Sequence, residues 1–156
     1  MSNVRPDPRY AWSPTITGSV GHVSINEING SPITSQFPLP HGTKGINTTR
    51  NWSSTIRGED GRNPNFIFKV NVPNDKAFDA EAERLRNLQT WHFIPDGEKK
   101  TNCSNAAYNA LSSGGVKKGL NVFSQFWPLW MATSMLTSSI FTDDIVLLEE
   151  VPWKQK

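Results

Sequence analysis

The chain contains a single cysteine, Cys103, and this constrains its fold more than any other residue does. One thiol cannot form an internal disulfide, so the fold must be held together by a packed core. The 156 residues are enough for one domain that buries roughly two-thirds of its unfolded surface. We therefore expect one domain over residues 18–156, preceded by an irregular arm, residues 1–17, that contains three prolines.

Charge and hydropathy argue against two classes of partner. The chain carries sixteen Lys and Arg against fourteen Asp and Glu, a net charge of +2, and the basic residues form no block. Neither a nucleic-acid partner nor an anionic membrane surface is therefore indicated. The apolar stretch 122–141 is interrupted by Ser, Thr, Gln and Pro, and a membrane span needs about 20 predominantly apolar residues. We expect no transmembrane anchor.

Alternating apolar and polar residues predict strands, two of them joined by a turn at Asn29-Gly30. The strands are expected at residues 21–28, 31–39, 66–72 and 145–151. Between the second and third lies a long polar loop, residues 40–65, of the kind that is often functional. Its Arg50, Arg57 and Arg62 either line a cleft for a carboxylate-bearing substrate or are simply solvated.

Three segments have helical signals, at residues 74–90, 102–112 and 128–140. The first has Phe78, Ala82 and Leu85 along one face. The second is capped by Thr101 or Asn102 and stopped by Ser113-Gly114-Gly115, which places Cys103 on its interior face. These elements predict an α+β domain, with an antiparallel sheet of about four to six strands packed against the Cys103 helix and one or two further helices.

The position of Cys103 at the start of a helix suggests chemistry. Unpaired backbone amides and the positive end of the helix dipole favour a thiolate there, and a thiolate is a nucleophile. Such a nucleophile needs a base, and the histidines available are His22, His41 and His92. His22 is favoured because a strand holds its side chain in one direction, whereas His92 lies in an aromatic cluster and is expected to be a packing residue.

Two short motifs, in this order along the chain, resemble those of a known superfamily. Gly21-His22-Val23-Ser24-Ile25 is followed by Asn29-Gly30, and much later Asn102-Cys103-Ser104 opens a helix that ends at Gly114-Gly115-Val116. This order resembles the circularly permuted papain-like cysteine hydrolases, which include the NlpC-type cell-wall peptidases and the lecithin:retinol acyltransferase relatives. The resemblance implies that Cys103 is the nucleophile, that His22 is the base, and that the Cys103 amide helps to stabilise the oxyanion.

A third residue usually orients the imidazole in this superfamily. It is a His, Asn or Gln on the next strand, about a dozen residues after the base, and here that stretch is Thr34-Ser35-Gln36. A two-residue Asn29-Gly30 loop places Ser35 on the His22 face, whereas a three-residue loop places Thr34 and Gln36 there. We favour Gln36 because its amide oxygen can accept a hydrogen bond from the imidazole, and the register stays open.

The same resemblance suggests a substrate and a partner. Compact bacterial proteins with such motifs resemble exported toxin effectors, which often act on peptidoglycan peptides. We therefore expect a peptidoglycan amidase or peptidase that needs no cofactor and is paired with a cognate immunity protein. Because MSNVRPDPRY contains no apolar run, we expect synthesis in the cytoplasm without a signal peptide and export by a specialised secretion system.

Other interpretations stay open. A lipid-directed acyltransferase or phospholipase of the same fold would use residues 122–141 as an acyl groove. Otherwise the group Phe126, Trp127, Trp130 and Met131 in this stretch packs under the sheet. A non-catalytic binding module would carry Cys103 as an inert buried thiol and His22 as a satisfied strand histidine. A zinc site is disfavoured, because one thiol and three histidines form no pair at the usual spacing of zinc ligands.

Overall fold

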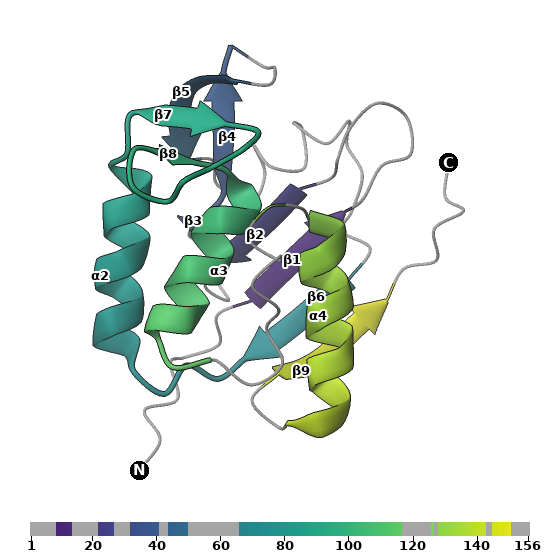
Figure 1. Cartoon of the computed structure of the whole chain (residues 1–156). Helices are drawn as coiled ribbons and strands as arrows, with labels where there is room; N and C mark the ends of the chain where they lie inside the picture. Colours follow the sequence, from purple (N-terminus) through teal and green to yellow (C-terminus); the bar gives the residue numbers. More distant parts are fainter. Residues whose placement is uncertain are drawn as a thin grey trace.

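The computed structural model describes residues 9–13, 22–26, 32–40, 44–49, 66–116, 126, 128–142 and 145–150, and the structural statements below concern these residues. They form two sheets and three helices, so the α+β class expected from the sequence is confirmed (Figure 1). Several residues singled out in the sequence lie outside the described residues: Asn29, Gly30, His41, Arg50, Arg57, Arg62 and Trp127.

The larger sheet is antiparallel and has the strand order β3-β2-β1-β6-β9. Its strands are β3 (Pro32–Thr34), β2 (His22–Asn26), β1 (Arg9–Ser13), β6 (Phe66–Val70) and β9 (Ile145–Glu150). All five residues of β2 are buried, so both faces of this strand are covered. The sheet therefore holds His22 in the interior of the protein.

The expectation of an irregular arm over residues 1–17 is wrong for residues 9–13. They form β1, which lies between β2 and β6 and pairs with both. The aromatic residues Tyr10 and Trp12 favour strand, and Pro8 and Pro14 bound the segment. The local sequence indicates this strand only weakly, because a central strand gains most of its stability from partners that are distant in the sequence.

The second sheet has the order β4-β5-β7-β8. Its strands are β4 (Gln36–Leu39), β5 (Lys44–Thr49), β7 (Thr90–His92) and β8 (Lys100–Thr101). The expected return strand 31–39 is therefore divided at Ser35 between two sheets, and the segment expected to be a loop contains β5. Polar β5, with the sequence KGINTT, lacks the apolar alternation by which a strand is recognised.

The three helices lie close to their predicted positions. They are α2 (Asp75–Arg86), α3 (Cys103–Ser113) and α4 (Pro128–Phe141). Asn74 caps α2, where its side chain accepts a hydrogen bond from the Ala77 amide at 3.0 Å. After α3 the chain reaches Gly115 with φ of 91°, a left-handed conformation that favours glycine and ends the helix.

The helices pack next to one another against the larger sheet (Figure 1). Helix α3 contacts both α2 and α4, and it also contacts β2, β3 and β4. Its small residues allow this close approach, since Ala106, Ala107 and Ala110 are all fully buried. The nucleophile candidate therefore lies on the central helix, and this helix contacts the strands that carry His22 and Gln36.

Part of the aromatic stretch 122–141 is accounted for by α4. Met131 and Met135 are fully buried in the core, whereas Trp130 is 44 % exposed. These two methionines pack in the core under the sheet, as one of the two interpretations of this stretch predicts. No helix among the described residues is long and apolar enough to span a bilayer.

Candidate active site

Cys103 is the first residue of α3, and it is 5 % exposed. The residue before it, Asn102, is the N-cap, and its Oδ1 accepts a hydrogen bond from the Asn105 amide at 2.7 Å. Because the first amides of a helix have no acceptor within the helix, the positive end of the α3 dipole lies at the thiol. The predicted placement of Cys103 at a capped helix N-terminus is thus confirmed.

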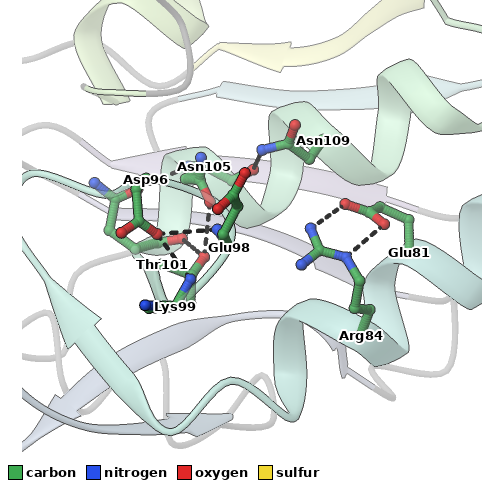
Figure 2. Close-up of polar contacts among 9 residues, drawn as sticks. Glu81, Arg84, Asp96, Glu98, Lys99, Thr101, Asn105 and Asn109 are labelled. Carbon is green, nitrogen blue, oxygen red and sulfur yellow. Dashed lines mark hydrogen bonds and ion pairs between the residues drawn. The ribbon is translucent and has the colours of Figure 1, made fainter.

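Asn102 also fixes the surroundings of the thiol. Its Nδ2 donates to the carbonyl oxygens of Phe93 and Phe126, each at 3.3 Å. Beneath the first turn of α3, the Thr101 hydroxyl donates to Asn105 Oδ1 at 3.0 Å (Figure 2). Asn102 thus joins α3 to the segment that follows β7 and to the segment that precedes α4.

The turn that leads into β8 and α3 is organised by Asp96. Its carboxylate accepts hydrogen bonds from the amides of Glu98, Lys99 and Lys100 at 2.8–2.9 Å (Figure 2). These bonds, the one from Lys100 foremost, lower the pKa of Asp96 from 3.8 to about 2. The carboxylate is fully exposed, so its role is to fix the turn rather than to take part in buried chemistry.

His22 is the first residue of β2, and it is 4 % exposed. Its Nε2 lies 3.1 Å from the hydroxyl oxygen of Ser35, and its ring stacks on Phe37 with centroids 4.0 Å apart. A hydrogen bond at the ring edge and a stacked ring on its face restrict both the tilt and the rotation of the imidazole. This is the environment that an oriented base requires.

The side chain that contacts the imidazole is that of Ser35, and Gln36, which we favoured, bonds elsewhere. The Gln36 side chain bonds to the side chains of Asn47 and Thr49 and to the Ser35 amide, whereas Ser35 contacts the imidazole. The pairing of Ile25 with Thr34 is the one that places Ser35 on the His22 face, and nearer the turn the register shifts, so that Asn26 pairs with Pro32. The hydroxyl of Thr34, the other alternative, is buried without a hydrogen-bond partner.

The structure brings together the elements that carry the two main candidates. Helix α3 begins at Cys103, β2 begins at His22, and the two elements are in contact. Both start at the end of the larger sheet that faces the four-stranded sheet (Figure 1). His92, by contrast, accepts a hydrogen bond from the Ile94 amide through Nδ1, at 3.0 Å, in its own loop.

The described residues contain no group of three or more His, Cys, Asp or Glu that could hold a metal ion. Ser35 is one of the three residues left open from the sequence as the imidazole partner, whereas the stacking of Phe37 on His22 was not expected. Comparison of the chain with protein-family models, curated proteins and solved structures gives no match.

Proposed function

We propose that this chain is a cysteine hydrolase in which Cys103 is the nucleophile and His22 is the base. One observation carries the proposal: the helix that begins at Cys103 packs against the strand that begins at His22, and both start at the same end of the sheet (Figure 1). An inert thiol would not require a neighbouring strand whose buried imidazole is held by a hydrogen bond and a stacked ring.

We assign Nδ1 of the imidazole as the base, because Nε2 contacts the Ser35 hydroxyl. When the neutral ring carries its proton on Nε2, that N–H donates to the Ser35 hydroxyl oxygen, and the lone pair is on Nδ1. Nδ1 is then the atom that takes the thiol proton. When the ring becomes doubly protonated, the same contact stabilises its positive charge.

The reaction follows from these roles. The Cys103 sulfur loses its proton to His22 and attacks the carbonyl carbon of an amide, forming a C–S bond and an oxyanion. The amides at the start of α3 stabilise that oxyanion. The C–N bond then breaks, the amine leaves with the proton held by His22, and water hydrolyses the thioester to release the acid and restore the thiol.

For the substrate we propose peptide amides of the bacterial cell wall. This rests on the resemblance of the two motifs to permuted papain-like enzymes, and the same resemblance supports a role as an exported antibacterial effector with a cognate immunity protein. The lipid-directed alternative has less support, because Met131 and Met135 of α4 are fully buried and cannot line an open acyl groove.

The proposal is tested by incubating the purified chain with peptidoglycan fragments and, separately, with phospholipid vesicles. Cys103→Ser and His22→Ala serve as matched variants that change one candidate each. Release of new amino and carboxyl groups from the stem peptides by the wild type, but by neither variant, would support the proposal. Fatty-acid release instead would assign the lipid-directed alternative, and no turnover of either substrate would favour a binding module.

A further inference from the structure

Two amide side chains, those of buried Gln36 and half-buried Asn47, connect the candidate base to the end of α2. Gln36 is 1 % exposed, and its Oε1 accepts hydrogen bonds from the Ser35 amide at 3.2 Å and from the Thr49 hydroxyl at 3.0 Å. Its Nε2 donates to Asn47 Oδ1 at 2.9 Å. Both ends of the Gln36 amide are therefore occupied, and one of them holds the backbone of Ser35.

Asn47 continues the same network into α2. Its Nδ2 donates to the carbonyl oxygens of Leu85 at 3.0 Å and Leu88 at 2.9 Å, and its backbone amide donates to Gln89 at 2.9 Å. The last carbonyls of a helix lack partners within the helix, so a side-chain amide is well suited to this position. A continuous path of hydrogen bonds thus runs from the end of α2 through Asn47, Gln36 and Ser35 to His22.

We propose that Asn47 and Gln36 are positioning residues for His22, which they hold through Ser35. The inference rests on the proposed cysteine hydrolase function. Helix α2 packs against α3, which carries Cys103, while its last turn holds the network that ends on the imidazole. One helix thereby sets the position of both members of the dyad, and catalytic groups must be held within about 0.5 Å of their working geometry.

The chain offers a matched control for this proposal at the other end of α2. Asn74 caps the start of the helix through a hydrogen bond to the Ala77 amide, so Asn74→Ala weakens α2 without touching the network. Asn47→Ala weakens the helix end and releases Gln36. We expect both variants to unfold at lower urea concentration than the wild type, but only Asn47→Ala to slow alkylation of Cys103 by iodoacetamide at pH 7, by about tenfold.

Two further measurements separate positioning from loss of stability. The alkylation rate of Asn47→Ala should follow the same pH dependence as that of His22→Ala, because the base is no longer held. In a Ser35→Ala background, Asn47→Ala should cause no further slowing, since its effect passes through Ser35. If Asn47→Ala does not fold, Gln36→Met takes its place, because it removes the amide bonds to both Ser35 and Asn47, and the same slowing is expected.

Equal alkylation rates in Asn47→Ala and Asn74→Ala would overturn the inference. It would also be overturned if the double variant were slowed by the product of the Ser35→Ala and Asn47→Ala effects. Failure of the proposed function looks different. In that case His22→Ala itself alkylates as fast as the wild type, whatever the comparison of the two asparagine variants gives.

Discussion

The imidazole of His22 stacks on the ring of Phe37, with centroids 4.0 Å apart and planes inclined by 21°. The two residues come from different sheets, because His22 begins β2 and Phe37 lies in β4. The hydroxyl of Thr48, on the neighbouring strand β5, donates to the carbonyl of Phe37 at 3.0 Å and fixes its backbone. The stack therefore joins the larger sheet to the smaller one at the candidate base.

Replacing the ring of Phe37 should impair the site more than the fold. Phe37→Leu keeps most of the buried apolar volume, so we expect the free energy of unfolding to fall by no more than about 1.5 kcal/mol. Loss of the aromatic contact, worth about 0.5–1.5 kcal/mol, should slow Cys103 alkylation by roughly twofold to tenfold. Phe78→Leu, at a fully buried position on α2, is the control that should lower stability without slowing alkylation. The same alkylation rate in both variants would contradict the orienting role of Phe37.

The unpartnered hydroxyl of Thr34 predicts a stabilising substitution. Thr34 is fully buried, and its Oγ1 has no hydrogen-bond partner. Thr34→Val has nearly the same shape and removes the unsatisfied oxygen, so the free energy of unfolding should rise by about 1 kcal/mol. Urea denaturation measures this directly. The variant should also alkylate like the wild type, and slower alkylation would show that Thr34, rather than Ser35, contacts the base.

Asn102 should affect stability through two separable contributions. Asn102→Ala removes the cap of α3, worth about 1 kcal/mol, together with the bonds to Phe93 and Phe126. Asn102→Ser keeps a capping oxygen and loses only those two bonds. The free energy of unfolding should therefore decrease from the wild type to the serine variant and again to the alanine variant. Equal stability of the two variants would mean that the cap contributes nothing.

The Asp96 carboxylate predicts how stability changes in acid. Its pKa falls from 3.8 to about 2 on folding, so its stabilising contribution is complete above about pH 4 and is lost as the pH falls through about 2. Asp96→Asn retains an acceptor oxygen and does not titrate. The stability difference between wild type and variant should be constant above pH 4 and shrink between pH 4 and pH 2 in thermal unfolding. A difference independent of pH over this range would contradict the assignment.

Local signals were enough to predict the helices. Asn74 and Asn102 mark the starts of α2 and α3, and Gly115 follows the end of α3. A helix cap and a helix stop act on the backbone within a few residues, so both can be recognised from the local sequence. The position of Cys103 at a helix start could therefore be predicted correctly.

Strands held by distant partners could not be predicted in the same way. β5 is polar and pairs with β4 and β7, and β1 is flanked in the sequence by Pro8 and Pro14. This also explains the preference for Gln36 over Ser35. The amide of Gln36 had an obvious use at the imidazole, but its partner is Asn47 on a strand that the sequence did not reveal. Pairing register decided the contact, and Ser35 bonds to His22.

The most direct test of the account is the pH dependence of Cys103 alkylation in the wild type and in His22→Ala. An isolated thiol, with a pKa of about 8.5, reacts roughly a hundredfold more slowly at pH 6 than at pH 8.5. We predict that the wild type slows by less than about tenfold over this range, because the dyad supplies thiolate, and that His22→Ala shows the full decrease. A hundredfold decrease in both proteins would show that His22 does not activate Cys103 and would contradict the account.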